Sequence, residues 1–545
     1  IDLGFAWTTL PSGRELAFVD VPGHVRFIRN MLAGVGAVDA CMFVVAATES
    51  WKPQSEEHLR ILELLGVRHG LIALTKAGLV DAEWQELARM EVEDRVAGTF
   101  LEGAEVVYVD APTGAGVDDL RLALDRLLAG TPTAADHDRP RLWVDRSFAA
   151  KGSGTVVTGT LAGGTLRVDD ELLLMDGEKG SRVRVRALQS HQRPHQEVGP
   201  GHRLAVNLTG VSHVEALRGH ALVRPNQWAP TRTVDASLGV LASLDHDVSR
   251  RGAFQVYIGS GEYSVRLRVL GTEVIPPGGQ GFIRLHLPAT LPLLPGDRYV
   301  LRESGRSETV GGGEVLDVSP FLPAARARPS RSVDRVIAER GWVDADQLER
   351  MTGERRPADV GGRWVVAPEV LEAARRELRN AVDAAGGPGL DVATLTDRQR
   401  VVLAELEGVV VESGRAWPAG AAAKAAAEEA LGTHPWLAQL RLERFSPPEP
   451  GPADRVVARE LVRRGLVIER DGVYFAKEAI DEAARVVARL LADSPDGFTV
   501  STARDALATT RKHVIPLLAH LDATGVTRRR GDLRIAGPRL PSPGT

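Results

Sequence analysis

The sequence predicts a multidomain protein with an α/β domain, two small β-barrels and a C-terminal array of winged-helix modules. Three observations support this fold class. Short apolar runs alternate with helical periodicity up to about residue 130, and alternating strands broken by Gly and Pro follow up to about residue 319. A pattern of helix and small hairpin then recurs. At roughly 150 residues per domain, the 545 residues suffice for about three to five domains.

The first region shows the alternation that is typical of a parallel sheet covered by helices on both faces. Buried strands are expected at Leu16–Val19, Cys41–Ala47, Leu71–Thr75 and Glu105–Val109. Helices are expected at His24–Leu32, Ser55–Leu65, Asp81–Val96 and Val117–Leu128. Ser55 is the expected N-cap of the second helix, with two glutamates in its first turn.

Composition excludes several classes of protein. The net charge of −5 and the pI near 6.3 mean that any nucleic-acid contact must be a local patch. A lone cysteine, Cys41, excludes a disulfide framework and a Cys-based zinc site, and we expect a reducing, cytoplasmic compartment. The longest uncharged apolar run, Ala40–Thr48, is far shorter than the ~20 residues of a membrane span, so no membrane partner is expected.

The middle region, from Arg139 to about Ser319, alternates Val, Thr, Leu and Arg between recurrent Gly and Pro turns. Its length predicts two small barrels or sandwiches with a seam near Arg224–Arg232.

The last region repeats a helix that ends in RGWV (340–343), RGLV (464–467) or TGVT (524–527). Two of these run into hairpin-like stretches at 467–476 and 526–537. Helix followed by hairpin predicts winged-helix modules; the alternative is one irregular helical domain. We expect a Pro-rich linker at 446–452 and a solvated helix at Ala416–Ala430.

The strongest local motif is Asp-Val-Pro-Gly-His at 20–24, which follows an apolar strand. Nucleotide hydrolysis needs a carboxylate to hold Mg²⁺ through water, a glycine beside the terminal phosphate and a side chain that orients water. Asp20, Gly23 and His24 suit these roles in order. Taken alone, the motif is also compatible with an ordinary strand-to-helix turn.

Two later loops complete the pattern of a guanine-nucleotide site. Thr75 and Lys76 end an apolar strand, where GTPases carry the element that frames the base. Asp110 and Ala111 begin the loop after the next strand, where such domains use backbone groups to read the guanine carbonyl. The order and spacing of the three motifs predict a GTPase core.

The chain resembles the bacterial selenocysteine-specific elongation factors, the SelB family of translational GTPases. The resemblance begins at IDLGFAW (1–7) and DVPGH (20–24) and continues to the Val at 67. It extends through 141–174, 201–211 and 291–317, is weakest between about 345 and 450, and returns at 509–537.

The resemblance implies GTP and Mg²⁺ as cofactors, and selenocysteinyl-tRNA, an mRNA hairpin beside a UGA codon and the ribosome as partners of a monomeric factor. The expected domains are a GTPase domain (1–135), two barrels (136–227 and 228–320) and winged-helix modules (328–450, 451–485 and 486–545). Tethering to the hairpin would make delivery at one UGA nearly intramolecular.

By the same resemblance, Asp145, Arg146 and Arg203 line the pocket for the selenocysteinyl group. A selenol ionises below neutral pH, so arginines would favour the selenolate over a serine hydroxyl. The alternative is that Asp145 and Arg146 form a structural ion pair at a barrel edge.

A local basic patch marks the last module. Residues 504–534 contain seven Lys or Arg against three Asp. Arg511 and Lys512 open a helix, and Arg528, Arg529 and Arg530 lie on the expected wing, so both clusters would contact RNA phosphates. The alternative is an ordinary solvated face.

Three departures from the family pattern stand out. The Gly-rich phosphate loop and the switch Thr would lie upstream of Ile1, so the GTPase core is expected to be incomplete as given. Gly78 stands at the place of the guanine-reading Asp, and Asp110 at the place of a small hydroxyl residue. Without that carboxylate, the preference for GTP over ITP or XTP is expected to be weak. If the protein discriminates strongly, Asp81, three residues after Gly78, is the first candidate to read guanine.

These departures leave two other functions to compare. One is a non-hydrolysing RNA-binding adaptor with a disabled GTPase module. The other is a DNA-binding regulator, which the preceding barrels disfavour.

Overall fold

The computed structural model describes residues 3–24, 30–32, 38–150, 154–178, 180–306, 308–386, 388–419 and 430–542. The chain forms two compact units, Ile1–Ala367 and Pro368–Thr545, and each is described by itself. None of the helices in these ranges combines the length and the apolar character that a membrane crossing requires.

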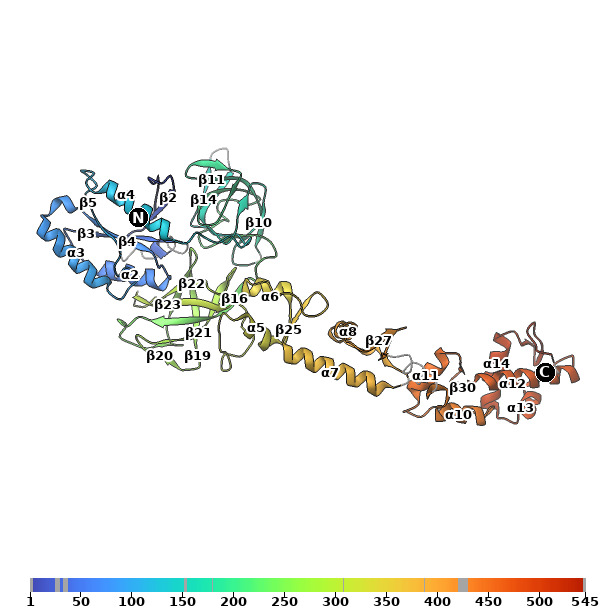
Figure 1. Ribbon diagram of the computed structural model, residues 1–545. Helices are drawn as coiled ribbons and strands as arrows, with labels where there is room; N and C mark the ends of the chain where they lie inside the picture. The colour runs from blue at the N-terminus through green and yellow to red at the C-terminus, as the bar shows by residue number, and fades with distance from the viewer. Residues whose placement is uncertain are drawn as a thin grey trace. The chain divides into compact units, whose positions relative to one another are not determined.

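The α/β domain is built on three parallel strands in the order β3-β4-β5 (Figure 1). They are β3 (Cys41–Ala46), β4 (Gly70–Thr75) and β5 (Val106–Val109). The helices are α2 (Pro53–Leu64), α3 (Ala82–Val96) and α4 (Val117–Gly130). Successive side chains of a strand point to opposite faces. Accordingly Ile72 and Leu74 pack with α2 and α3, whereas Leu71 packs with α4. The expected layers are therefore confirmed.

The start of the domain differs from the prediction. β2 (Glu15–Asp20) pairs antiparallel with β1 (Gly4–Thr9), a strand that was not predicted, instead of joining the parallel sheet. The expected N-cap Ser55 is also wrong. α2 begins two residues earlier, at Pro53, because the fixed φ of proline suits the first helical turn. Most of the expected helix His24–Leu32 lies outside the described residues.

The first barrel is an eight-stranded sheet in the order β10-β15-β6-β8-β14-β11-β12, with β7 on β8. The pairing of β10 with β11 closes it around an apolar core. Its strands are β6 (Arg141–Trp143), β7 (Arg146–Ala150), β8 (Gly154–Ala162), β10 (Glu171–Met175), β11 (Ser181–Ser190), β12 (Arg193–His195), β14 (Arg203–Thr209) and β15 (Ala221–Val223). A short ladder joins β9 (Leu166–Arg167) to β13 (Glu197–Val198).

The second barrel is closed in the order β16-β21-β19-β18-β22-β23. Its strands are β16 (Thr231–Val240), β18 (Phe254–Ile258), β19 (Gly261–Leu270), β21 (Gln280–Leu291), β22 (Arg298–Glu303) and β23 (Glu308–Asp317), and β17 (Val248–Ser249) pairs with β20 (Val274–Ile275). Tyr257 and Val300 of this barrel pack into the core beneath α2. An ion pair of 2.9 Å between Arg302 Nη1 and Glu57 Oε1 adds a polar link between helix and barrel.

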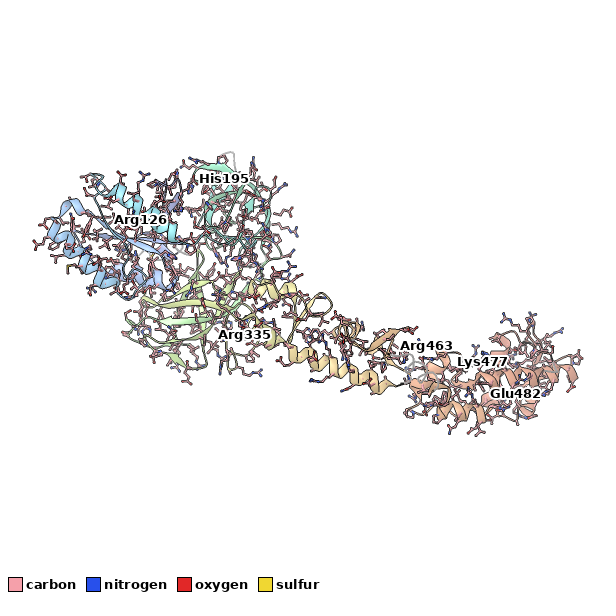
Figure 2. The ribbon with its side chains drawn as sticks, viewed as in Figure 1. Arg126, His195, Arg335, Arg463, Lys477 and Glu482 are labelled. Atoms are coloured by element: carbon pink, nitrogen blue, oxygen red, sulfur yellow. The ribbon has the colours of Figure 1, made fainter. Side chains whose placement is uncertain are left out.

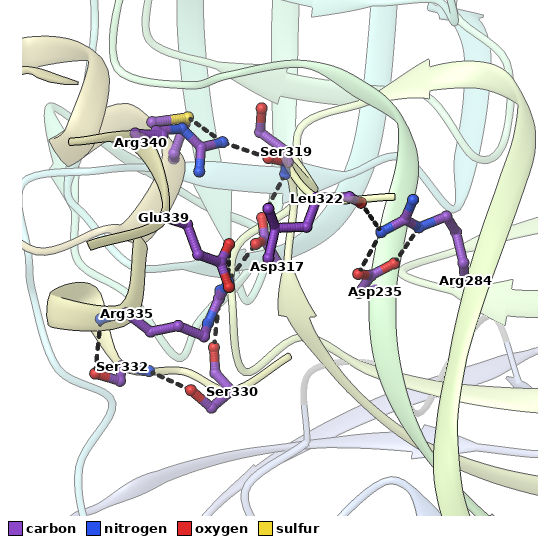
Figure 3. Close-up of polar contacts among 11 residues, drawn as sticks. Asp235, Arg284, Asp317, Ser319, Leu322, Ser330, Ser332, Arg335, Glu339 and Arg340 are labelled. Carbon is purple, nitrogen blue, oxygen red and sulfur yellow. Dashed lines mark hydrogen bonds and ion pairs between the residues drawn. The ribbon is translucent and has the colours of Figure 1, made fainter. Parts of the chain in front are cut away.

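The first winged-helix module packs directly on the second barrel. It contains α5 (Val333–Arg340), β24 (Trp342–Asp344), α6 (Ala345–Thr352) and β25 (Trp364–Val366), and its apolar residues join the barrel core. Figure 3 shows the polar side of this junction, where Arg335 bridges Asp317 at 2.8 Å and Glu339 at 2.7 Å. Nearby, Arg284 holds the buried Asp235 through two hydrogen bonds of 2.6 and 2.8 Å. Core and ion pairs together fix the module to the barrel.

The second unit repeats helices and small hairpins, as predicted. Its first part contains α7 (Pro368–Ala385), β26 (Leu390–Asp391), η3 (Val392–Thr394), α8 (Asp397–Ala404), β27 (Val409–Glu412) and β28 (Arg415–Pro418). The rest contains α10 (Pro435–Leu442), α11 (Arg455–Arg463), β29 (Val467–Arg470), β30 (Val473–Ala476), α12 (Lys477–Asp493), β31 (Phe498–Thr499), α13 (Val500–Ala506), α14 (Arg511–Ala523), β32 (Thr527–Arg530) and β33 (Leu533–Ala536).

Two details of this unit differ from the sequence interpretation. The expected helix Ala416–Ala430 begins as strand β28, because Arg415 and Ala416 pair with β26 and β27. The expected boundary between residues 485 and 486 falls inside α12. One side of that helix, at Ala479, packs with α10 and α11, and another, at Val487, packs with α14. The last two modules therefore share a helix.

A buried carboxylate joins two segments of this unit. Glu460 on α11 is fully covered and pairs with Arg463 and Arg464 at 2.8 Å each. Arg415 on β28 reaches the same carboxylate at 3.3 Å. Figure 2 labels Arg463, one of these partners, among the side chains of this unit. Three guanidinium groups thus compensate the buried charge of Glu460 and fasten β28 to α11.

Candidate functional site

The predicted nucleotide-binding loops lie at the carboxyl ends of strands. Thr75 ends β4 and is paired in register with Val109, the last residue of β5, so the loops after these strands are neighbours. In open α/β sheets, ligands bind in the crevice at this edge. The structure therefore brings the Thr75–Gly78 and Asp110–Gly114 segments together.

Asp20, the predicted magnesium ligand, ends β2 and is exposed. It lies opposite Gly4, and a Cβ at that glycine would come within 3.0 Å of Asp20 Oδ2. An exposed carboxylate at a strand end suits a hard cation that prefers oxygen ligands and retains water. Gly23 and His24 follow it and are also exposed.

The base-framing element has a distinct backbone. Lys76 is in the left-handed region with φ of 57°, and the short helix η2 (Ala77–Leu79) follows. The Lys76 ammonium donates to Glu49 Oε1 at 2.9 Å, and this hydrogen bond lowers the pKa of Glu49. The Thr75 hydroxyl donates to the Val45 carbonyl at 3.4 Å. Both expected residues therefore lie at this sheet edge, and Lys76 is exposed.

The loop after β5 is closed by its own backbone. Asp110 N–H donates to the Ala115 carbonyl, and Gly114 N–H donates to the Asp110 carbonyl, both at 2.9 Å. The Thr113 hydroxyl donates to Asp110 Oδ2 at 2.6 Å. Asp110 is buried, whereas Ala111 is exposed. This loop is pre-organised for a ligand at the sheet edge.

The predicted aminoacyl-pocket residues also come together, on β7 and β14 and the turn before β7. Asp145 accepts from Arg203 Nη1 and, at 2.9 Å, from Arg203 Nη2, and it accepts a third hydrogen bond of 2.6 Å from Thr158. The alternative pairing of Asp145 with Arg146 is therefore wrong, since Asp145 faces Arg203. Arg146 instead donates to the Leu3 carbonyl.

Sequence reasoning missed one residue at this place. The ring of Phe5 lies under both arginines, with its centroid 3.5 Å from Arg203 Cζ and 4.8 Å from Arg146 Cζ. Cation–π contact of this kind holds a guanidinium plane against an aromatic face. Phe5 belongs to β1, the unpredicted strand, and nothing in its local spacing pointed to partners 141 and 198 positions away.

The basic residues of the last module divide into two groups. Arg511 and Lys512 open α14, and Arg528, Arg529 and Arg530 are exposed on β32, where the sequence placed them. Lys512 pairs with Glu449 of the Pro-rich segment at 2.8 Å. Side chains alternate along a strand, so Arg529 points away from the face of its two neighbours.

Two further arginines counted in this patch have structural partners. Arg534 is buried and pairs with Asp522 at 3.1 Å, while Arg504 pairs with Asp505 at 2.7 Å. Fewer basic side chains are therefore available for RNA than the seven counted in the sequence, and those that remain lie on α14 and β32.

The comparisons with known proteins agree with this layout. The model of the elongation factor Tu GTP-binding domain matches residues 5–130, and that of elongation factor Tu domain 2 matches residues 154–223. The winged-helix model of elongation factor SelB matches residues 489–536. The chain is 31% identical to the selenocysteine-specific elongation factor of Desulfomicrobium baculatum, over 98% of this chain and 93% of that relative. The chain belongs to the family of selenocysteine-specific elongation factors.

Other members of the family extend the likeness. The factor from Escherichia coli is 29% identical over 98% of this chain and 92% of its own length. The crystal structure of a bacterial selenocysteine-specific elongation factor aligns with a TM-score of 0.66 at 23% identity, over 98% of this chain and 93% of that one. The structure of SelB from Methanococcus maripaludis in complex with a GTP analogue aligns with a TM-score of 0.52 at 22% identity, over 59% of this chain and 74% of that one. This chain is a translational GTPase with the multidomain fold of the family.

Proposed function

We propose that this elongation factor delivers selenocysteinyl-tRNA to the ribosome at UGA codons, in a GTP-dependent manner, while its C-terminal modules hold an mRNA hairpin. The observation that carries the proposal is the convergence of Arg146 and Arg203 at one place of the first barrel in a chain that ends in a basic wing. Two guanidinium groups beside an aromatic ring suit an anionic aminoacyl group, and a basic wing suits an RNA backbone.

GTP and Mg²⁺ are the proposed cofactors. Asp20 holds the metal ion through water, Gly23 faces the terminal phosphate, and His24 orients the attacking water. Thr75 and Lys76 frame the base, and the backbone from Asp110 to Ala111 meets the guanine carbonyl. The pairing of Thr75 with Val109 puts the two base-contacting loops at one sheet edge, and the exposed Asp20 at the end of β2 suits the metal ion.

Recognition of the amino acid is assigned to the two arginines beside Phe5. A selenolate carries a negative charge at neutral pH, whereas a serine hydroxyl is neutral. Charge-assisted hydrogen bonds are about twice as strong as neutral ones, so the pair of guanidinium groups discriminates between these two aminoacyl groups.

The hairpin anchor is assigned to α14 and β32. Arg511 and Lys512 on one element and Arg528, Arg529 and Arg530 on the next contact the RNA backbone. Tethering raises the local concentration of the factor at one codon without any new contact to the ribosome.

A reconstituted translation reaction tests the proposal. A message with one UGA codon, with and without the downstream hairpin, is translated with selenocysteinyl-tRNA and this factor. We expect selenocysteine insertion that requires both GTP and the hairpin. Equal insertion without the hairpin would contradict the anchor. Tight binding to both RNAs without ribosome-stimulated GTP hydrolysis would favour a non-hydrolysing adaptor instead.

A further inference from the structure

We propose that the side chain of Asp110 supplies the carboxylate that reads the guanine base, in place of a residue at position 78. The inference rests on the proposed binding of GTP and adds the specificity-determining residue. Guanine presents two adjacent donors, N1–H and the 2-amino group, and a carboxylate can accept both at once.

Gly78 and Asp110 occupy one space. A Cβ built on Gly78 would lie 2.8 Å from Asp110 Oδ2 and 2.9 Å from its Cγ. Contacts this short require one of the two groups to shift, so any side chain at 78 would move the Asp110 carboxylate from its present place. Gly78 is not among the glycines with positive φ, so its backbone does not demand glycine. A side chain at position 78 and the Asp110 carboxylate in its present place are therefore alternatives to each other.

The carboxylate is held ready for a ligand. Asp110 directly follows β5, it is 6% exposed, and the Thr113 hydroxyl fixes Oδ2 at 2.6 Å. An ionised carboxylate has about four acceptor positions. Thr113 uses one of them, which leaves capacity for two donors on a base edge. A buried carboxylate also gains most from such partners, because its own desolvation is otherwise costly.

The other acidic groups near this edge are engaged elsewhere. Asp81, which the sequence suggested first, caps α3 by accepting from Trp84 N–H at 2.9 Å. Glu49 pairs with Lys76 at 2.9 Å. Asp110 is therefore the acid whose carboxylate lies where a side chain of residue 78 would begin.

Nucleotide competition in the full-length protein tests this assignment. GTP is compared with ITP, which lacks the 2-amino group, and with XTP, which carries a 2-carbonyl. We expect the unmodified protein to prefer GTP over both by about tenfold to a hundredfold, the scale of a bidentate contact to a base edge. In Asp110→Asn the amide donates to the 2-carbonyl of xanthine, so the preference should invert toward XTP. A purely structural Asp110 would not produce this inversion.

Two controls keep the test decisive. Asp81→Asn retains a good helix cap and should leave the order of the three nucleotides unchanged. Thermal unfolding should show that Asp110→Asn stays folded, since its amide oxygen can still accept from Thr113. The double variant Gly78→Asp with Asp110→Ser moves the carboxylate to the other loop and should again prefer GTP.

The result that overturns the inference is equal affinity of the unmodified protein for GTP and ITP, or an unchanged order in Asp110→Asn. Failure of the proposed function is separable. If Asp110→Asn prefers XTP but no variant delivers selenocysteinyl-tRNA with its preferred nucleotide, the base assignment stands and the delivery function does not.

Discussion

The guanidinium of Arg203 lies over the ring of Phe5, with Cζ 3.5 Å from the ring centroid, and it pairs on its other side with Asp145. A residue of the first barrel is thus held between a strand of the α/β domain and a buried acid. Arg146 has a different environment, because it donates to a backbone carbonyl, that of Leu3. Arg203 therefore contributes more to the stability of the barrel than Arg146, although the resemblance assigns both of them the same role.

The first prediction separates these two roles. Arg146→Ala should weaken selenocysteinyl-tRNA more than the same tRNA charged with serine, by about 1.5–3 kcal/mol, because only the selenolate loses a charge-assisted contact. Equilibrium binding to both charged tRNAs measures the difference. Equal losses for the two aminoacyl groups would remove Arg146 from selenium recognition.

Arg203→Ala should also destabilise the barrel. Its partner Asp145 has a side chain only 6% exposed, and removal of one member of a buried pair costs about 3–5 kcal/mol. We expect a clear fall of the melting temperature for Arg203→Ala and a smaller fall for Arg146→Ala, because Arg146 donates to the neutral carbonyl of Leu3. The matched pair Arg203→Ala with Asp145→Ala should recover part of the loss, because no buried charge is then left unpaired.

The second prediction concerns hydrolysis. His24→Ala should leave the affinity for GTP nearly unchanged and lower ribosome-stimulated hydrolysis roughly a hundredfold or more, since only the orientation of water is lost. Single-turnover hydrolysis on ribosomes measures this effect. A rate equal to that of the unmodified protein would exclude His24 from catalysis.

The third prediction concerns the wing. Arg529→Ala should reduce the slope of log affinity against log salt by about one and weaken every hairpin alike, if this residue neutralises one phosphate. Filter binding over a series of salt concentrations gives the slope. Binding that does not respond to salt would contradict the phosphate contacts of the wing.

Arg534 is the matched control for Arg529, its cross-strand neighbour. Since Arg534 is buried against Asp522, Arg534→Ala should lower the melting temperature and leave the salt slope of the folded fraction unchanged. The full chain is the proper sample, because a fragment beginning at residue 486 would cut α12.

The fourth prediction is a pH dependence centred on Glu460. Burial acts to raise the pKa of Glu460, but hydrogen bonds from Arg463 and Arg464 and the charge of Arg415 outweigh it, so the pKa is lowered. A lowered pKa stabilises the fold fully above about pH 4.3, the value of an unfolded glutamate, and this contribution is lost as the pH falls through the lowered value.

Glu460→Gln should therefore be less stable than the unmodified protein at pH 7, by about 1–3 kcal/mol, because two of the three guanidiniums keep some contact with water. The stability difference between the two proteins should shrink as the pH falls through the lowered pKa of Glu460. Thermal melts between pH 3 and pH 7 measure both trends. Parallel curves across this range would show that the ion pairs do not contribute.

Elements with strong local periodicity were predictable. The strands that became β3, β4 and β5 are continuous apolar runs, and the wing of the last module follows from its alternation around a Gly turn. β1 was not predicted because GFAWTT is only partly buried and shows neither the two-residue period of a strand nor the 3.6-residue period of a helix. The module boundary was placed inside α12 because the sequence of one helix does not show which of its apolar residues pack in which module.

The site shows the same limit. Positions 20, 24, 75 and 76 could be proposed as site residues from motifs, because each motif is a short continuous stretch next to a strand end. The partner of Asp145 and the relation of Gly78 to Asp110 could not, because they join residues that are 58 and 32 positions apart. Considered in its own loop, Gly78 lacks the acceptor of the family pattern and Asp110 lacks its hydroxyl. Only the packing of the two loops shows that the Asp110 carboxylate lies beside Gly78.

The helix shared by the last two modules has a mechanical consequence. α12 is continuous over 17 residues and buries apolar side chains in both cores, so the wing and α11 are joined without a hinge. A pull on β32 would be transmitted along about 25 Å of rigid helix instead of being absorbed in a joint. An mRNA bound by this wing would therefore be attached to a rigid pair of modules. Any flexibility between the mRNA and the rest of the chain would have to come from segments that precede α10.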